Sequence, residues 1–594
     1  MAELTCWDVV LRIRGPLLTS SSAPLGFGID TPFARNAAGD YYLAGTLIRG
    51  RLKQSWQEFE AIVGSNDWDW PRWIGKDPPE SNEQWASERG LLQFTDFIYQ
   101  DSPAKPLNKP VITYRIKRDR ETKAVESGQN QMIQSPFLAG EEYEFAGKIW
   151  AIACEDESKK IDTSLIQGLR WTPAVGAETS VGYGVITGAT INRCTMWRQG
   201  DGWETEANAD RWGLALEPEG PLCLSGRRLA ENIFVSEPEI TGGVIKGAIA
   251  NLMFGLDEKK GRDISSLDSP LAKEFSKIRV LHAKPVRKGT NKRPGTIPLS
   301  AIKIETNKGE QLQDAALIRE LAPLNKRPPA FAIDWKSTAD AEAHFGIVSP
   351  IRELRVRTRI EKDKRRAMDE KLFAYRMLAP RAIGVDGKVE EYEWLTEVDF
   401  EGIDEDKRFQ VKRELAGLLK KNGLPGVGKL KTRCAASLRR FDTNKMRPAT
   451  KDTWIVTLRT PAVLCDIEAV LSGLNSAHAA YAKYFARESF NTLELVRHFA
   501  EQRLSGGGYL WREFQESKKY RPYVMTQPGS TFVLKLAGDE QAANDKLANW
   551  LRSGLPVSAE VPDGQDWRTC PYVPENGFGE IIVNQDWQGE GVGR

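Results

Sequence analysis

The chain has 594 residues, of which 41% are hydrophobic and 28% are charged, the composition of an ordinary globular protein with about three to five domains. It contains no apolar stretch long enough to span a membrane, and its first residues lack the basic and apolar segments of a secretory signal. We therefore expect a cytoplasmic protein that contacts no membrane. The seven cysteines are far apart in the sequence, so they predict neither a local zinc clip nor a disulfide framework.

The net charge of +2 hides three strongly basic segments. Residues 277–293 contain seven Lys and Arg and no acid, residues 352–366 contain eight basic and three acidic residues, and residues 429–440 form a third basic cluster. A basic segment is often only a solvated face. Three of them favour contact with phosphate groups and indicate a nucleic acid as a partner.

Several patterns recur along the chain. Residues 41–59 and 239–254 both predict an apolar strand followed by a glycine-containing turn and an amphipathic helix, a place where open backbone N–H groups can bind phosphate. Residues 112–129 and 354–373 alternate Arg with apolar or hydroxyl residues, which predicts hairpins with one cationic face. An exposed amphipathic strand with scattered ion pairs is the alternative for each hairpin.

Glycine-rich turns followed by β-branched residues suggest where successive units end. They lie at 175–188, 423–432 and 576–584, which predicts three related units in tandem. Short strands alternate with helices throughout, so we expect an α+β fold. Polar, turn-rich joins predict domains at 1–215, 216–450 and 451–594.

Several common active-site motifs are absent from the sequence. Gly423, Gly428 and Lys429 match GxxxxGK, but Leu430 replaces the Ser or Thr that would hold magnesium, and a helical pattern precedes the motif where a strand is needed. The four histidines all follow residue 281, and neither GxSxG nor HExxH occurs. Histidine catalysis is therefore not expected from the N-terminal domain alone.

Two motifs in residues 26–56 point to a family. They are Gly28-Ile29-Asp30-Thr31-Pro32 and Ala44-Gly45-Thr46-Leu47-Ile48-Arg49-Gly50, and they are followed by Gly90-Leu91-Leu92-Gln93-Phe94-Thr95-Asp96, the basic hairpin 115–128 and the glycine-rich segment 175–185. In this order the motifs resemble the backbone subunit of type III CRISPR effector complexes, a member of the RAMP superfamily. The resemblance covers about residues 5–190.

The second part of the chain, about residues 216–594, resembles the cap-type RAMP subunit that holds the 5′ handle of the guide RNA. The segments that carry this resemblance are Thr241-Gly242-Gly243-Val244-Ile245-Lys246-Gly247, the hairpin 357–373, Arg521-Pro522-Tyr523, Gly529-Ser530-Thr531-Phe532 and Gly577-Phe578-Gly579. Together the two resemblances imply a fusion of both types, as in subtype III-D. They also imply three ferredoxin-like, RRM-related units with extended β-hairpin insertions.

The resemblance implies a function and a set of site residues. The chain would bind guide RNA within a type III CRISPR ribonucleoprotein, alongside other subunits including a large polymerase/cyclase-type subunit, and cleave complementary target RNA through its N-terminal domain. Asp30 matches the catalytic aspartate of the family, which works with Mg²⁺ or another divalent metal. The expected RNA contacts are Arg35, Arg49, Lys53, Arg115, Lys117, Arg118, Lys246, Arg357 and Arg359.

Two alternatives remain at this stage. The chain could be a non-catalytic RNA scaffold, with Asp30 serving as a turn residue ahead of Pro32. It could also be a guide-processing endoribonuclease, although such enzymes usually depend on histidine and the N-terminal domain has none. In the second half, Glu237 precedes Pro238 without the Gly-Ile-Asp loop, so we expect this half to be non-catalytic.

Overall fold

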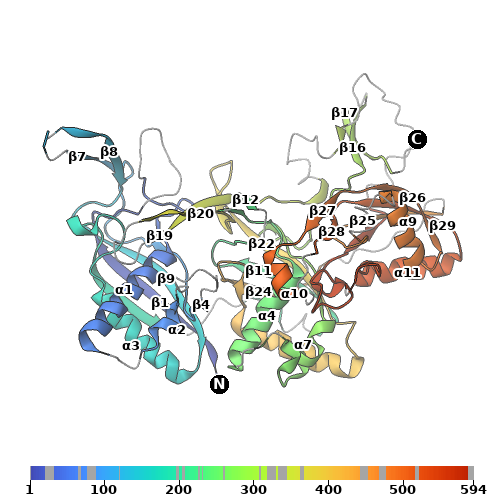
Figure 1. Cartoon of the computed structure of the whole chain (residues 1–594), viewed down its shortest axis with the longest axis horizontal. Helices are drawn as coiled ribbons and strands as arrows, with labels where there is room; N and C mark the ends of the chain where they lie inside the picture. The colour runs from blue at the N-terminus through green and yellow to red at the C-terminus, as the bar shows by residue number, and fades with distance from the viewer. Residues whose placement is uncertain are drawn as a thin grey trace.

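We describe a computed structural model of the chain (Figure 1). The described residues are 2–19, 32–64, 68–76, 88–118, 121–122, 124–194, 200–203, 208–224, 228–230, 232–258, 261, 263–306, 309–316, 330–331, 344–360, 367–441, 452–466, 476–514, 521–562 and 564–585. Helices and largely antiparallel sheets alternate along the chain, so the predicted α+β class is confirmed. Among the described helices, none has the length and apolar character needed to cross a bilayer.

The first unit is built on a six-stranded sheet with the order β10-β1-β9-β6-β2, and β5 also pairs with β9. Its elements are β1 (Glu3–Arg14), β2 (Tyr42–Leu43), α1 (Gly45–Val63), α2 (Trp70–Ile74), β3 (Gly75–Lys76), β4 (Glu88–Arg89), β5 (Gln93–Phe94), β6 (Phe97–Tyr99), β7 (Val111–Arg118), β8 (Val125–Ser135), β9 (Glu142–Ala153), α3 (Glu155–Trp171) and β10 (Val185–Arg193). Taken as β1-α1-β6-β9-α3-β10, the unit has βαββαβ connectivity, the pattern of a ferredoxin-like unit.

Alternation along β1 explains which face of this sheet is covered. Trp7, Val9, Leu11 and Ile13 are all fully buried, as expected when every second side chain points to the same side of a strand. They form one core with apolar residues of α1 and α3. The opposite face of β1 carries Cys6, Asp8 and Arg12.

The second unit is built on a seven-stranded sheet with the order β14-β22-β11-β24-β23, to which β15 and β21 add through β22. Its sheet and helices are β11 (Arg211–Pro218), α4 (Gly242–Leu256), α5 (Pro270–Glu274), β14 (Arg279–Val280), β15 (Lys284–Arg287), β21 (Arg381–Ile383), β22 (Val389–Asp399), α7 (Glu405–Asn422), β23 (Leu424–Val427) and β24 (Thr432–Arg439). In the first unit, the sheet order β10-β1-β9-β6 places the four strands of the βαββαβ pattern in the order fourth, first, third, second. The order β24-β11-β22-β14 repeats this arrangement in the second unit.

The third unit has a four-stranded sheet with the order β26-β29-β25-β30. Its elements are β25 (Thr453–Leu458), α9 (Ala477–Glu488), β26 (Leu493–Phe499), β27 (Gln502–Ser505), α10 (Gly508–Phe514), β28 (Tyr523–Thr526), β29 (Thr531–Leu536), α11 (Glu540–Ser553) and β30 (Ile581–Val583). The strand order is again fourth-first-third-second. Each of the three units therefore has its own sheet with the same connectivity.

Hairpins extend from these sheets (Figure 1). The β7–β8 hairpin projects from the first unit, and a small sheet of β16, β17 and β18 lies near the third unit. A separate sheet with the order β12-β13-β20-β19 lies over the region between the first two units. The bounds of these insertion strands are β12 (Arg228–Ala230), β13 (Ile233–Val235), β16 (Ala301–Thr306), β17 (Gly309–Asp314), β18 (Ala330–Phe331), β19 (Arg352–Ile360) and β20 (Ala367–Leu378).

Buried charges join the second and third units. Arg293 pairs with Glu397 at 3.0 Å and with Glu580 at 2.9 Å, and Arg459 pairs with Glu580 at 3.0 Å. Burial would raise the pKa of Glu580, but the two arginines lower it well below its ordinary value. Removing one partner from such a network leaves a buried charge uncompensated.

The predicted boundary at 215/216 falls inside β11, which belongs to the second sheet.

Candidate nucleic-acid interface

The acidic loop singled out by the sequence, at residues 28–32, contains Asp30, which lies outside the described residues. The structure does describe the base of this loop. The backbone N–H of Ala34 donates to the carbonyl of Thr19 at 3.2 Å, so the chain segments that enter and leave the loop lie side by side. The N–H of Ala177, in the glycine-rich segment, donates to the carbonyl of Leu18 at 2.8 Å. The glycine-rich segment thus supports the start of the acidic loop.

Three predicted RNA contacts lie near the base of this loop or on the adjoining helix α1. Arg35 is exposed, lies 4.1 Å over the ring of Tyr41 and donates to its hydroxyl group. Arg49 is half-buried and donates to the carbonyl of Ile74, whereas Lys53 is half-buried further along α1. Arg35 is therefore the most accessible of the three cations.

The start of α1 is occupied by protein rather than open to a ligand. The N–H of Gly45 donates to a carboxylate oxygen of Asp96 at 3.0 Å. A Cβ at this glycine would clash with the carbonyl oxygen of Thr95, so glycine allows close packing of two backbone segments here. An anion at a helix N-terminus is stabilised by the helix dipole, and Asp96 supplies that anion.

The described residues around the loop do not supply the oxygen ligands that a magnesium site requires. Asp40 accepts a hydrogen bond from the side-chain amide of Asn36 at 3.1 Å, and Asp96 is paired with Arg355 at 2.7 Å. Among the described residues, the three side chains that lie close enough together to hold a metal ion are elsewhere, at Cys6, Asp8 and Cys194. Without Asp30, which lies outside the described residues, these side chains do not form a magnesium site.

The β7–β8 hairpin carries exposed cationic and apolar side chains. Arg115 is exposed and forms an ion pair with Glu178, which ties the hairpin to the glycine-rich segment. Tyr114 is 63% exposed, and neighbouring apolar residues of β7 are also exposed. Lys117 and Arg118 lie in β7, but their side chains are outside the described part of the chain. The hairpin projects as predicted (Figure 1).

The prediction that Lys246 contacts a phosphate is wrong. Lys246 lies in α4 and is only 7% exposed, and its ammonium donates to the carbonyls of Ser276 and Ile278 at 3.3 and 2.9 Å. Burial lowers its pKa to about 8. The physical reason is that α4 is apolar on most of its sides, and such a helix is buried together with its occasional polar residue. Lys246 therefore joins two backbone segments.

The second predicted cationic hairpin, β19–β20, turns toward the first unit (Figure 1). Arg355 of β19 is buried between Asp96 of the first unit at 2.7 Å and Glu353 at 2.5 Å. Its guanidinium also lies 4.6 Å from the ring centre of Tyr42. The sequence analysis missed Arg355, although its spacing of two from Arg357 places both on one face of the strand.

Arg357 and Arg359 follow Arg355 along the same strand. Arg357 is half-buried, and its guanidinium lies 5.5 Å from the ring centre of Tyr375. Arg359 belongs to β19, but its side chain is outside the described residues. The strand therefore carries one arginine into an ion pair between units and a second onto an aromatic surface.

That aromatic surface lies where the first two units meet. The rings of Phe234 and Tyr375 are stacked, with centres 5.3 Å apart and planes 19° from parallel. The ammonium of Lys429 lies 3.4 Å from the centre of the Phe234 ring. Arg89 of the first unit donates to the carbonyl of Lys429 at 2.5 Å. We call the residues Arg89, Phe234, Arg357, Tyr375, Lys429 and Lys431 the junction cluster.

A glycine turn positions the lysines of the junction cluster. The N–H of Lys429 donates to the carbonyl of Cys223 at 2.7 Å, and Gly428 has a φ of 66°. A Cβ at Gly428 would lie 2.6 Å from the carbonyl oxygen of Cys223, so this position requires glycine on both counts. The end of the GxxxxGK sequence, after β23, thus forms a turn that docks on a neighbouring loop and presents an exposed lysine.

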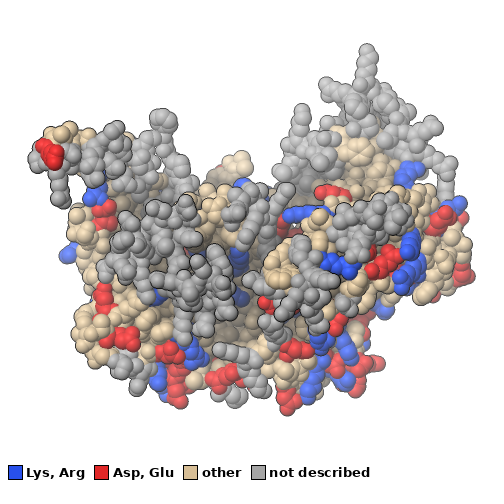
Figure 2. Space-filling model, in the orientation of Figure 1, with Lys and Arg blue, Asp and Glu red and all other residues tan. Residues whose placement is uncertain are grey.

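Positive charge is concentrated in the junction cluster. Burial and then the repulsion of Arg355 lower the pKa of Arg357. Burial and then the repulsion of Arg89 lower the pKa of Lys431. Like charges held this close are stabilised when a polyanion binds among them. By contrast, acidic and basic side chains are interspersed along the lower edge of the described surface in Figure 2.

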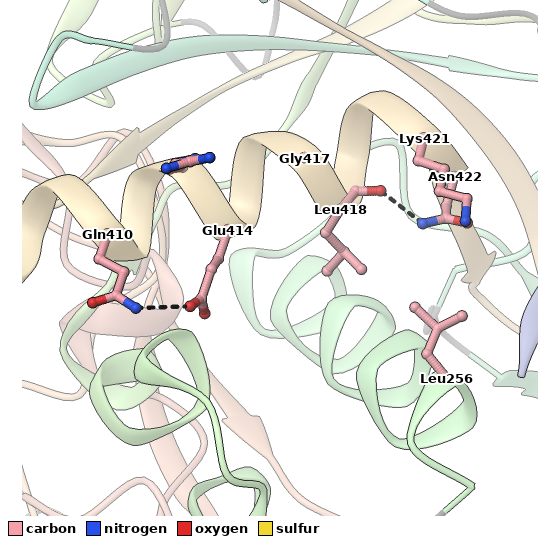
Figure 3. A pocket seen from close by; sticks show the side chains of 8 residues that line it. Leu256, Gln410, Glu414, Gly417, Leu418, Lys421 and Asn422 are labelled. Carbon is pink, nitrogen blue, oxygen red and sulfur yellow. Dashed lines mark hydrogen bonds between the residues drawn. The ribbon is translucent and has the colours of Figure 1, made fainter. Parts of the chain in front are cut away.

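A cavity of about 490 Å³ on α7 is a weaker candidate for a ligand site (Figure 3). Most of its polar side chains bond within the helix or to a neighbouring unit: Gln410 donates to Glu414 at 3.5 Å, and Asn422 donates to the carbonyl of Leu418 at 2.9 Å. Lys421 pairs with Glu3 of the first unit at 2.8 Å. These groups stabilise the helix and its contact with β1.

Comparison with protein families decides the nature of the first unit. Residues 10–187 match the model of the RAMP superfamily. We call the first unit the RAMP domain, because the match covers most of it. The matched range includes β1, the acidic loop, α1, the β7–β8 hairpin and α3. Comparison with curated proteins gave no significant match.

Solved CRISPR complexes contain chains that align with this one. A chain of type III-B Cmr-beta bound to cognate target RNA is 18% identical, with a TM-score of 0.22 over 32% of this chain and 61% of that chain. A chain of the same complex with target RNA and AMPPnP is 11% identical, with a TM-score of 0.28 over 57% of this chain and 88% of that one. A chain of a type IV-B CRISPR complex is 17% identical, with a TM-score of 0.21 over 33% of this chain and 93% of that chain. This chain thus spans about three fifths of the length of the first of these chains.

Proposed function

We propose that this chain is a guide-RNA-binding subunit of a type III CRISPR ribonucleoprotein and that its RAMP domain cleaves complementary target RNA. The observation that carries the RNA-binding part is the junction cluster, in which cationic side chains surround a stacked aromatic pair beside the RAMP domain. The family match of residues 10–187 supports the same assignment. The expected partners are guide RNA, target RNA and other effector subunits, including a large polymerase/cyclase-type subunit.

The chemistry of the junction cluster suits single-stranded RNA. Arginine and lysine neutralise phosphates, and aromatic rings stack on bases whatever their sequence. Contacts of this kind position a nucleic acid without reading it, so the base sequence would be recognised by pairing between guide and target. Arg35 and Lys429 are exposed and can therefore meet phosphate from solvent.

Cleavage is assigned in this proposal to Asp30. A carboxylate can align the 2′-hydroxyl with the scissile phosphate or accept its proton. The hydrogen bond between Ala34 and Thr19 fixes the two ends of the loop that carries Asp30. A divalent metal ion remains part of the proposal and would neutralise charge on the phosphate when bound.

The RNA-binding part is tested by purifying the chain from its natural host and sequencing the bound RNA. Guide RNAs that share a repeat-derived 5′ sequence are expected. RNA of random sequence, or an affinity that does not fall as salt rises, would contradict the binding role.

The cleavage part is tested separately in the assembled complex. Asp30→Ala should slow target cleavage by about 100-fold or more, the worth of a general base, while guide binding is unchanged. Asp101→Ala is the matched control, since Asp101 is exposed and pairs only loosely with Lys105 at 3.7 Å. Addition of a chelator should stop cleavage. A wild-type complex that binds target but never cuts it would reduce the role to that of a scaffold.

A further inference from the structure

The connectivity of the RAMP domain brings together two cysteines that are far apart in the sequence. Cys6 lies in β1, and Cys194 directly follows β10, the neighbouring strand. The N–H of Cys194 donates to the carbonyl of Cys6 at 2.8 Å, so the two residues lie opposite each other. Asp8 lies two residues further along β1 and therefore on the same face as Cys6. The two sulfur atoms and a carboxylate oxygen of Asp8 all lie within 4.8 Å of one another.

A cation already occupies the edge of this cluster. Lys148 of β9 lies opposite Asp8 in the sheet register. Its ammonium is 2.5 Å from a carboxylate oxygen of Asp8 and 3.7 Å from the sulfur of Cys194. The surroundings therefore stabilise positive charge at this point. The Lys148 side chain is 37% exposed, so it can turn toward solvent and leave Asp8 to another cation.

We propose that Cys6, Asp8 and Cys194 form a Zn²⁺ site with a fourth position open to water. Two sulfur ligands favour a soft cation, and zinc accepts cysteine and carboxylate together in tetrahedral geometry. With Zn–S bonds of about 2.3 Å, tetrahedral geometry places two sulfur atoms about 3.8 Å apart, and the ligand atoms here lie within 4.8 Å of one another. On binding, each thiol loses its proton to solvent, and Lys148 turns away from Asp8.

The position of the site suggests what the metal would do. Cys194 is the residue at which the chain leaves the last strand of the RAMP domain, and Cys6 lies in its first strand. Cys6 is buried, whereas Asp8 and Cys194 are half-buried, so the metal would enter from the side of Cys194. Bound zinc would fasten the first and last strands together where the chain continues toward the second unit. This inference does not depend on RNA binding or cleavage.

The test measures zinc in the purified full-length chain. After removal of metal with a chelator under reducing conditions, the chain should take up one zinc ion, and Cys194 should then be protected from alkylation. The double variant Cys6→Ser/Cys194→Ser should bind no zinc. Cys154→Ser is the matched control, because this half-exposed cysteine precedes α3 and is not part of the cluster. It should bind zinc as the wild type does.

Two further variants keep the proposal testable if the double variant folds poorly. Asp8→Asn should weaken zinc binding at least about tenfold, because it removes a charged ligand. Lys148→Ala should strengthen it up to about fivefold, the worth of the partly exposed ion pair that zinc must otherwise break. A chain that takes up no zinc, zinc that remains in the double variant, or a Cys6–Cys194 disulfide formed in place of zinc binding would overturn the proposal.

Discussion

The RAMP domain and the second unit both begin their first helix with glycine, yet the glycine packs against different parts of the chain in the two units. In α1 the N–H of Gly45 is bonded to Asp96, and the cations Arg49 and Lys53 that follow are half-buried at the surface. In α4 the hydroxyl of Thr241 accepts from the N–H of Val244 at 3.3 Å. A Cβ on Gly242 would lie 2.6 Å from the carbonyl oxygen of Asn576, in the third unit.

Both cases show that a glycine at a helix start marks a close backbone approach, and in both the approaching group is protein. The cation that follows the glycine differs in its burial. Lys246 of α4 is 7% exposed and donates to two carbonyls, whereas Arg49 of α1 is half-buried and donates to one. The hairpins differ in the same way: β7–β8 projects outward, and β19–β20 packs Arg355 against Asp96.

The largest expected effect comes from breaking the contact between the two regions at Arg355. Arg355→Met leaves Asp96 and Glu353 without their buried partner and should destabilise the chain by about 3–5 kcal/mol. Thermal unfolding of the full chain measures this. Arg381→Met is the control, because Arg381 is 57% exposed and its ion pair with Glu391 is worth about 1 kcal/mol or less. Equal decreases in unfolding temperature in the two variants would show that β19 does not join the units.

A second, smaller effect concerns the turn that precedes α4. Burial would raise the pKa of Glu239, but the charge of Lys284 and a hydrogen bond from His282 lower it to about 2. The folded pKa lies below the unfolded value, so this carboxylate stabilises the fold above about pH 4.5 and loses its effect as the pH falls toward 2. Its contribution is about 2–3 kcal/mol.

The free energy of unfolding, measured between pH 2 and 7, tests this contribution of the Glu239 carboxylate. Glu239→Gln should be less stable than the wild type at neutral pH, and the gap should close as the pH falls through the acid range. A gap that stays constant down to pH 2 would mean that Glu239 is not held as a buried carboxylate.

The smallest effect is the change in guide-RNA affinity that we expect from the substitution Lys246→Met. Guide affinity should stay within about twofold of the wild type, because the ammonium is buried. Stability gives the positive readout: the folded pKa of Lys246, about 8, is below its unfolded value, so wild-type stability should rise between pH 8 and 10.5. The variant should lack this rise. A large loss of RNA affinity would restore the phosphate contact that the sequence predicted.

The sequence predicted the α+β class, the glycine-led helices and both cationic hairpins, because these features rest on local spacing. The role of Lys246 was predicted wrongly, since a turn motif does not show what packs against it. Apolar residues on most sides of α4 were the available signal that the helix is buried.

The junction cluster and the cysteine pair could not be predicted from local patterns. Phe234, Tyr375 and Lys429 are brought together by three different segments, and Cys6 meets Cys194 only through the pairing of β1 with β10. The basic run at 429–440 did indicate where part of the cluster lies. The role of Asp30 stays a prediction from the family resemblance.

The central claim, that the junction cluster holds RNA, is tested most directly by guide-RNA affinity measured over a range of salt concentrations. The triple variant Arg357→Gln/Lys429→Gln/Lys431→Gln is compared with Lys273→Gln/Arg381→Gln/Lys388→Gln, which removes the same charge from exposed positions of the second unit. The junction variant should lose affinity about tenfold or more, and its salt slope should fall by about 0.7 per lost contact. The control should behave as the wild type. Equal losses in both variants would show that only net charge matters and would contradict the account.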